Sequence, residues 1–467
     1  MDIVNSGLKT PSAARTPVSR GASTKLKAQA SYSLLKRGIW MYFLLLIFEG
    51  ALRKWVFPGL ATPLLVVRDP IAIWLVFACW KEGLLPRSGF LIATLLVSIM
   101  AFFTALLAGH GNFLVAFFGA RVFLFHFPLI YVIGRVFNQE DVIKMGRATL
   151  MLSIPMALLV ALQFYSPQSA WVNRGVGGVE TAGFTGALGY SRPPGTFSFT
   201  NGNSLFYGFA AGFVFYFWLR RENINKLVLT AATFALLIVI PLSISRGLFF
   251  TVVVCFLFVV LASVRNPRFL SQMVIAVIVA SLAFLLLSQL SFFQTSIEAF
   301  TSRFNGANES EGGLEGVLVD RYLGGMIAAF SLPSGLAFWG TGMGAYSNVG
   351  TMLLAGQVVS AVSEGEWGRM IQELGPMLGL TIVFVRLGVS AQLSMMAYSR
   401  LKKRDVLPWI LLSFSLLNFP QGNWAQPTSL GFCILSTGLV LASFRPSAGV
   451  DVLTRDSHKL RNRHYSK

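Results

Sequence analysis

The sequence predicts an all-α protein that crosses a membrane about twelve times, and three observations support this. Of the 467 residues, 54% are hydrophobic and 12% are charged, whereas an ordinary soluble domain has about 25% charged residues. Apolar stretches of about 20 residues, the length that spans a bilayer, recur along the chain. Lys and Arg gather in alternate connections between these stretches, as the positive-inside rule requires.

The expected spans are separated by short polar connections, with two exceptions. They lie near residues 38–57, 61–80, 88–108, 114–136, 146–165, 202–219, 227–243, 247–264, 269–291, 374–399, 406–422 and 427–444. Counted from the cytoplasm, these crossings return both termini to the cytoplasmic side and place the Lys/Arg clusters there. The number of spans and the charge distribution therefore agree.

The formal net charge of +19 follows from the same topology. In the expected cytoplasmic connections the basic residues are Arg220, Arg221, Lys226, Arg265, Arg268 and those of the run 400–404, and both tails are basic as well. Because these charges already have a topological reason, we expect no nucleic-acid partner. The three cysteines lie in apolar stretches without metal-ligand spacing or a disulfide pattern, so we interpret them as small buried hydrophobic residues. The expected external loops contain no cluster of metal ligands, and we expect no cofactor.

The chain is expected to divide into two tails, two groups of spans and a large loop. We predict a disordered cytoplasmic tail at 1–37, spans one to nine at 38–291 with an external loop at 166–200, a large external loop at 292–373, spans ten to twelve at 374–444 and a cytoplasmic tail at 445–467. Loops longer than about 12 to 15 residues are usually functional or disordered. The larger loop contains an amphipathic run and a glycine-rich run, so we expect it to fold.

Six arginines are expected on the external side, where positive charge should be scarce. They are Arg174, Arg192, Arg246, Arg303, Arg321 and Arg369. Arginine stays charged and presents a planar fork that binds phosphate or carboxylate oxygens with two hydrogen bonds. The cluster therefore suggests an anionic ligand at the outer membrane face. The alternative is that single arginines pair with loop acids such as Glu180, Glu298 or Asp320.

Arg192 and Arg246 have the sequence context of a binding site. Two prolines and a glycine follow Arg192 and set an irregular backbone that leads into the sixth span. Asn201 and Asn203 then lie at a helix N-terminus, where free N–H groups and the helix dipole favour an anion. Arg246 lies in a tight turn between two apolar helices, a place that needs no charge, and is thus a functional candidate.

Other charged residues fall within the expected spans. Glu49 and Arg53 are four residues apart on one helix face and can neutralise each other. For Arg121, His126 and Arg386, buried pairing and contact with a lipid phosphate are both open interpretations.

Four short motifs carry a family resemblance. They are Arg192-Pro-Pro-Gly-Thr-Phe with Asn201, the Ser-Ile-Ser-Arg246-Gly turn, Arg321 followed by a Gly-Thr-Gly-Met-Gly loop, and residues 364–375 entering the tenth span. In order and spacing, and together with the layout of spans from about residue 40 to 445, they resemble the O-antigen ligase and oligosaccharide repeat-unit polymerase superfamily of bacterial envelopes.

The resemblance implies a metal-independent, inverting glycosyltransferase of GT-C-like architecture in the bacterial cytoplasmic membrane. Such an enzyme takes glycan from an undecaprenyl-diphosphate carrier at the outer face and passes it to a hydroxyl of a glycan or lipid acceptor. Arginines near the diphosphate would stabilise the charge that develops as it leaves. The residues expected to bind the diphosphate and substrate are Arg192, Arg246, Arg321, Arg369, Asn201 and Asn203. Membrane lipids, a chain-length regulator and export proteins are further expected partners.

The acceptor hydroxyl also needs a general base. Ligases of this superfamily carry a histidine before the last group of spans, and this sequence has none in its large external loop. Glu364 and Glu366 occupy the matching place and are the predicted bases, whereas Glu373 is more typical of a helix start or packing contact. The alternative is that these acids only pair with Arg369. The missing histidine favours a polymerase over a ligase, and His110 stays an alternative base.

Two other classes of function fit the same composition. A secondary transporter or flippase for polysaccharide lipids would also have twelve spans with intramembrane charge, although its charges should lie nearer the membrane midplane. A non-catalytic membrane scaffold would use the arginines to hold lipid head groups. Loss of transfer in a Glu366→Gln variant with intact lipid binding would exclude the scaffold, and uptake of a labelled carrier into vesicles would favour the transporter.

Overall fold

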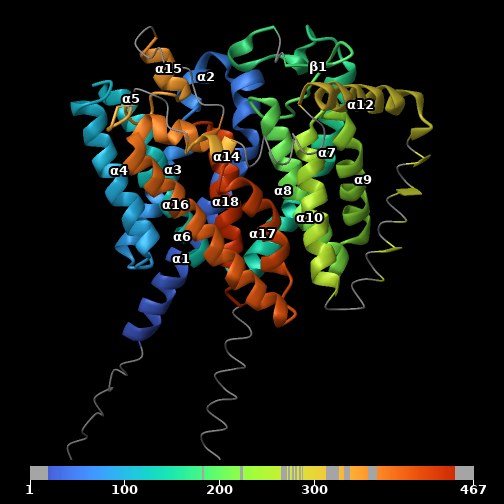
Figure 1. Ribbon diagram of the computed structural model, residues 1–467. Coiled ribbons are helices and arrows are strands. Elements are labelled where there is room, and N and C mark those ends of the chain that lie inside the picture. Colours follow the sequence, from blue (N-terminus) through green and yellow to red (C-terminus); the bar gives the residue numbers. More distant parts are fainter. Residues whose placement is uncertain are drawn as a thin grey trace, which may run out of the picture.

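The protein is built almost entirely from helices that run between two opposite ends of the molecule (Figure 1). The computed structural model describes residues 19–446 apart from 181–183, 221–223, 265–270, scattered positions within 272–287, 312–324, 331–336 and 356–364. Within these residues, β-structure is confined to a short antiparallel hairpin of β1 (Thr185–Ala187) and β2 (Tyr190–Ser191).

The elements of the first half are α1 (Ser19–Ala51), η1 (Leu52–Val56), η2 (Pro58–Leu60), α2 (Ala61–Leu64), α3 (Asp69–Lys81), α4 (Gly89–Leu107), α5 (Phe113–Arg121), η3 (Val122–His126), α6 (Phe127–Val136), α7 (Gln139–Tyr165), η4 (Trp171–Asn173), η5 (Val176–Gly178) and α8 (Thr200–Leu219). The second half contributes α9 (Lys226–Leu242), α10 (Arg246–Val264), α12 (Ser291–Glu311), α14 (Gly325–Ala328), α15 (Asn348–Leu353), α16 (Glu366–Lys402), α17 (Leu407–Asn418) and α18 (Pro427–Ser443).

Six helical segments of the described chain are long and apolar enough to cross a membrane. They are Pro58–Lys81, Gly89–Leu107, Phe113–Val136, Gln139–Tyr165, Arg246–Val264 and Glu366–Lys402, and shorter apolar helices occupy Lys226–Leu242, Leu407–Asn418 and Pro427–Ser443. These segments confirm the prediction of a helical membrane protein. The predicted spans coincide with helices of the structure, except that about half of 269–291 lies outside the described residues. The count of twelve crossings stays a prediction.

Three helices begin earlier than the hydropathy of the sequence indicates. The predicted span 38–57 continues α1, which starts at Ser19, so part of the stretch 1–37 that was predicted to be a disordered tail is helical. The predicted span 146–165 is part of α7, which starts at Gln139 because Asn138 and Asp141 form a capping box that supplies its first hydrogen bonds. The predicted span 374–399 is part of α16, which starts at Glu366 and bends sharply at Gly375, where φ is 78°. Pro376 follows directly, and an added Cβ at Gly375 would collide with the carbonyl oxygen of Phe338. The nine residues before the bend, Glu366–Leu374, are all buried.

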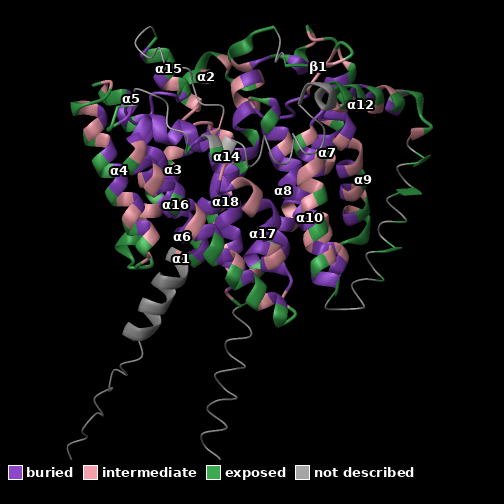
Figure 2. Ribbon diagram, viewed as in Figure 1, coloured by how far each residue is buried: buried purple, intermediate pink, exposed green. Residues whose placement is uncertain are grey.

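The apolar core surrounds α18, the last described helix. Almost every residue of α18 is buried, and it packs against α6, α8 and α17. Figure 2 shows the same concentration of buried residues in the middle of the bundle. By contrast, about two thirds of the residues in the most apolar stretches of α4 and α10 are not buried inside the protein. A helix that is both apolar and exposed is what a lipid environment requires.

Charged side chains buried among the membrane helices pair with one another. This agrees with the first of the two open interpretations, buried pairing, and not with contact to a lipid phosphate. Glu49 accepts hydrogen bonds from Arg68 at 3.0 Å and from Arg53 at 3.5 Å. Arg121 donates twice to the carboxylate of Asp69, at 2.7 and 2.8 Å. The imidazole of His126 lies 2.9 Å from the same carboxylate and 3.0 Å from the hydroxyl of Tyr42.

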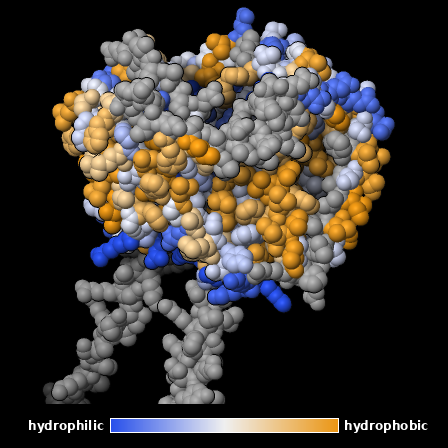
Figure 3. Space-filling view, in the orientation of Figure 1, coloured by the Kyte–Doolittle hydropathy of each residue, from blue (hydrophilic) through white to orange (hydrophobic). Residues whose placement is uncertain are grey.

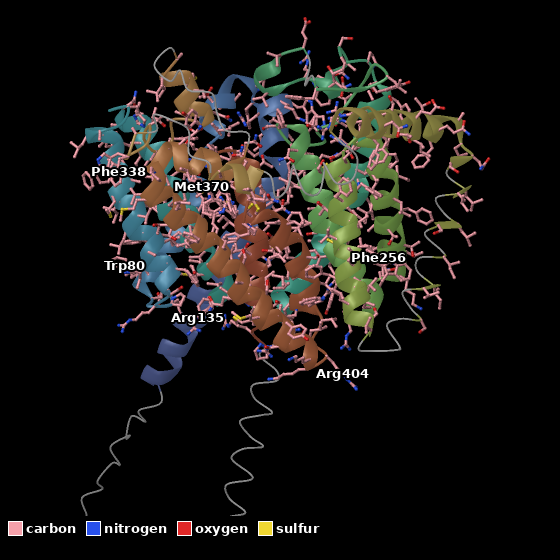
Figure 4. All side chains as sticks on the ribbon, in the orientation of Figure 1. Trp80, Arg135, Phe256, Phe338, Met370 and Arg404 are labelled. Atoms are coloured by element: carbon pink, nitrogen blue, oxygen red, sulfur yellow. The ribbon has the colours of Figure 1, made fainter. Side chains whose placement is uncertain are left out.

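Hydrophilic surface is concentrated at the two ends of the molecule. Figure 3 shows an apolar band between hydrophilic patches at the upper and lower ends, and Figure 4 shows Arg135 and Arg404 at the lower end. The connection after α16, with the expected cytoplasmic basic run 400–404, lies at that lower end (Figure 1). The upper end carries the hairpin, α12 and α15. Which end faces the cytoplasm stays a prediction from the charge rule.

A labelling experiment tests this orientation. Arg174 and Arg404 are both exposed, and the native cysteines Cys79, Cys255 and Cys433 are buried and should not react. In intact cells, a membrane-impermeant maleimide should label an Arg174→Cys variant and leave Arg404→Cys unlabelled. Detergent permeabilisation, the control, should expose both positions. Labelling of Arg404→Cys in intact cells would reverse the predicted topology.

Candidate functional site

Three arginines from distant parts of the chain line one cavity of about 400 Å³, here named the arginine cavity. Arg192 comes from the loop before α8, Arg246 is the first residue of α10, and Arg303 lies on α12. The cavity lies at the upper end of the bundle, where α8 and α10 begin and α17 ends (Figure 1). Guanidinium groups brought together in this way form a binding surface for an anion.

The rest of the cavity wall is neutral and has two chemical characters. The polar side chains are Asn201, Ser245, Thr251, Asn418 and Gln421. Their amides and hydroxyls both donate and accept hydrogen bonds, as sugar hydroxyls require. The apolar side chains are Ile244, Phe250, Val254 and Leu417. The cavity can therefore accommodate an anionic, a polyhydroxylated and an apolar group side by side.

The loop that carries Arg192 is held from both sides at Gly195. Its carbonyl accepts hydrogen bonds from the buried ammonium of Lys54 at 2.6 Å and from the side-chain amide of Gln163 at 3.2 Å. Its N–H donates to the amide oxygen of Gln163 at 2.7 Å. Gly195 has a φ of 61°, which glycine adopts without strain. The proline- and glycine-rich sequence thus forms an irregular but anchored backbone.

Neighbouring contacts extend this anchoring to the start of α8. The hydroxyl of Thr196 donates to the carbonyl of Ile47 at 2.6 Å, and Arg53 donates to the hydroxyl of Ser198 at 3.0 Å. Asn203 is buried, and its amide nitrogen lies 3.4 Å from the carbonyl oxygen of Pro193. Asn203 therefore supports the loop from below, and Asn201 lines the cavity itself.

The turn that carries Arg246 has an unusual backbone. Ile244 is buried and has a φ of 46°, in the left-handed region that β-branched residues avoid. Such a conformation costs on the order of 1–3 kcal/mol and persists only where the surroundings hold it. The hydroxyl of Ser245 does so by accepting from the hydroxyl of Ser204 at 2.9 Å and from the N–H of Leu248 at 3.3 Å.

Glu366 lies in a buried network of ion pairs and does not line the arginine cavity. Arg369 donates to both of its carboxylate oxygens at 2.8 Å, and Arg386 donates to one of them at 3.2 Å. The backbone N–H of Trp424 donates to the same carboxylate at 3.0 Å. This is the pairing that the sequence analysis gave as the alternative to a catalytic role.

The network reaches the cavity through the turn between α17 and α18. Arg386 donates to the carbonyls of Phe419 and Gly422 at 2.9 and 2.7 Å. Asn418 and Gln421, in or beside that segment, line the cavity. The Glu366 network therefore positions one wall of the cavity even though it lies outside it.

Glu373 and the glycine-rich run form a separate contact. Arg369 pairs with Glu373 at 2.7 Å, and Glu373 accepts hydrogen bonds from the backbone N–H groups of Tyr346 and Gly344 at 2.9 and 3.3 Å. This matches the packing contact expected for Glu373. Both ring nitrogens of His110 face backbone partners, the carbonyl of Met343 at 3.1 Å and the N–H of Asn112 at 3.0 Å.

The structure thus brings together part of the predicted site. Arg192, Arg246 and Asn201 share the cavity, whereas Arg369 and Glu366 belong to the buried network. Asn203 supports the loop beside the cavity without lining it. The two remaining predicted residues, Arg321 and Glu364, lie outside the described residues. Arg303 was predicted to be an external arginine but not a binding residue. Asn418 and Gln421 were not predicted to belong to the site. The unusual number of external arginines could have identified Arg303. Asn418 and Gln421 are neutral amides in a turn, and no sequence pattern identifies them as site residues.

Comparisons with known proteins give no relative for this chain: no family model, no curated protein and no solved structure matches it.

Removing the Glu366 carboxylate should destabilise the protein. In a Glu366→Gln variant, Arg369 and Arg386 lose a charged partner in a buried environment, a change that costs about 3–5 kcal/mol in comparable pairs. We expect a clearly lower melting temperature in detergent, measured by intrinsic fluorescence. The matched control is Glu140→Gln, which removes a carboxylate paired with Lys144 at the exposed start of α7 and should melt like the parent. Equal melting of both variants would show that the network does not stabilise the fold.

Proposed function

We propose that the arginine cavity binds the diphosphate of a lipid-linked glycan and that the protein is a membrane glycosyltransferase. The observation that carries this proposal is the convergence of Arg192, Arg246 and Arg303 on one cavity at one end of the membrane bundle. A diphosphate at a membrane surface has the charge to match several guanidinium groups. The amide-lined wall suits the attached sugar, and the apolar wall suits the first part of the lipid.

In the proposed reaction an acceptor hydroxyl oxygen attacks the anomeric carbon of the donor sugar. The bond between that carbon and the diphosphate oxygen breaks, and its electron pair leaves with the lipid diphosphate. Guanidinium groups would stabilise the negative charge that develops on the leaving oxygen. The hydroxyl proton passes to a general base, for which Glu364 stays the predicted candidate, because Arg369 and Arg386 hold the Glu366 carboxylate outside the cavity. We favour a polyprenyl diphosphate as the donor's carrier. We also favour the polymerisation of repeat units over transfer to a separate lipid acceptor.

The first experiment is a transfer assay with purified protein. The protein in detergent is mixed with an undecaprenyl-diphosphate-linked oligosaccharide without divalent metal, and products are separated by gel and mass spectrometry. A ladder of repeats supports a polymerase, and a single transfer to an added lipid acceptor supports a ligase. Binding of the carrier without product would instead favour the transporter or scaffold.

Variants of the three arginines test the cavity itself. Arg192→Ala, Arg246→Ala and Arg303→Ala should each lower the transfer rate by about 100-fold or more, the effect typical of losing one group that stabilises transition-state charge. The Lys variants should recover part of the activity because they keep the charge but lose the fork. The control is Arg174→Ala, an exposed arginine outside the cavity lining, which should keep full activity. Full activity in the three cavity variants would reject the site.

A further inference from the structure

A second and larger cavity lies at the opposite end of the bundle. It has a volume of about 640 Å³ and is formed by the residues before and at the start of α4 together with parts of α6, α16 and α18. Arg135, one of its lining residues, is at the lower end in Figure 4. It shares no residue with the arginine cavity, so the proposed transfer reaction does not account for it.

Three arginines line this lower cavity: Arg87, Arg135 and Arg445. Arg445 is fixed at the end of α18, since its guanidinium donates to the carbonyl of Phe137 at 3.2 Å and its own carbonyl accepts from the N–H of Gln139 at 3.0 Å. Arg87 and Arg135 are exposed. Asp and Glu are absent from the described residues that line the cavity. The positive charge of its rim is therefore not balanced within the cavity.

The remainder of the lining is mainly apolar and belongs to the membrane-spanning part of the helices. It includes Phe90, Ile130, Leu393, Met396, Leu441 and Phe444. The lining also contains the hydroxyls of Ser88 and Tyr131, which lie 3.2 Å apart. The cavity thus combines a cationic rim, a few hydroxyl groups and an apolar interior. A ligand that matches this combination has an anionic head, a polar linker and a hydrocarbon tail.

We propose that the lower cavity is a binding site for an anionic phospholipid of the surrounding leaflet. Its volume falls within the range of about 300–1,000 Å³ found for sites that enclose a small organic molecule, which is more than a single phosphate ion needs. Basic pockets between membrane helices on the cytoplasmic side are known to hold acidic lipid head groups. The predicted orientation places this end, with its many Lys and Arg residues, at the cytoplasmic surface.

The bound lipid would connect helices that are far apart in the sequence. α4 packs against α16, and α6 packs against α18. A phosphodiester held by Arg87, just before α4, and by Arg135 on α6 would connect the two pairs. α6 and α18 already approach so closely that a Cβ added at Gly134 would lie 2.5 Å from the side chain of Leu441. Because a ligand that binds the folded state stabilises it by mass action, the lipid should raise the melting temperature.

Lipid titration of the purified, delipidated protein tests the proposal. Phosphatidylglycerol and phosphatidylcholine with the same acyl chains are added separately, and inorganic phosphate is added in a third arm. We expect phosphatidylglycerol to raise the melting temperature and to remain bound in native mass spectra, and we expect the other two to do neither. Equal effects of both lipids would reject a head-group site, and equal protection by phosphate would point to a free anion instead of a lipid.

Paired variants locate the effect. The double variant Arg87→Gln/Arg135→Gln should retain phosphatidylglycerol about tenfold less well, because basic residues at the membrane surface contribute substantially to anionic lipid binding. The matched control, Lys402→Gln/Lys403→Gln, removes two exposed charges at the C-terminal end of α16, outside the cavity lining, and should retain the lipid like the parent. Equal loss in both double variants would show a general surface-charge effect and overturn the proposal. Transfer activity in a fixed detergent mixture should be unchanged in both, so this test is independent of the arginine cavity.

Discussion

The structure depends on pairing charges that lie between its membrane helices, because a charge in a low-dielectric interior is costly without a partner. The Glu49–Arg68 pair shows how this pairing joins distant elements. Glu49 is on α1 and Arg68 directly precedes α3, and Arg68 also donates to the carbonyl of Pro427 at the start of α18. Removing either partner would leave the other as an unpaired charge in the apolar interior. Each pair therefore holds together the elements that carry its two residues.

Buried charged side chains also hold the irregular segments around the arginine cavity. Lys54 and Arg53 on η1 bond to Gly195 and Ser198 in the loop before α8. On the other wall, Arg386 bonds to the carbonyls of the turn after α17 while Glu366 holds its guanidinium. Chain segments without regular hydrogen bonding are tolerated at membrane depth only when protein groups satisfy them. The intramembrane charged residues therefore do more than neutralise one another, because they also position the walls of the arginine cavity.

Much of the helical layout could be predicted from the sequence, because apolar length and positive charge at one end are local properties. The long start of α16 could not, since Glu366–Leu374 carries charged residues and its burial depends on Arg386 from beyond the bend. The site shows the same division. Arg192 and Arg246 stand out in their local sequence, whereas Arg303 joins them only because α12 packs near β1, where Arg303 contacts the carbonyl of Gly186 at 3.4 Å. Asn418 and Gln421 are neutral turn residues whose role is set by the fold alone.

Arginine side chains line both cavities, but their surroundings differ. The difference fits the functions proposed for the two cavities. Arg192 and Arg246 belong to backbone that is anchored by buried hydrogen bonds or held in a strained turn. A group that stabilises transition-state charge must be in place before the reaction, since reorganising it would raise the barrier. Arg87 and Arg135 instead lie exposed on a rim above an apolar cavity. A phospholipid head group is itself mobile, and flexible cations at its depth can bind it without preorganisation. The anchored backbone of Arg192 and Arg246 thus suits a site for chemistry, and the exposed side chains of Arg87 and Arg135 suit a site that holds a lipid.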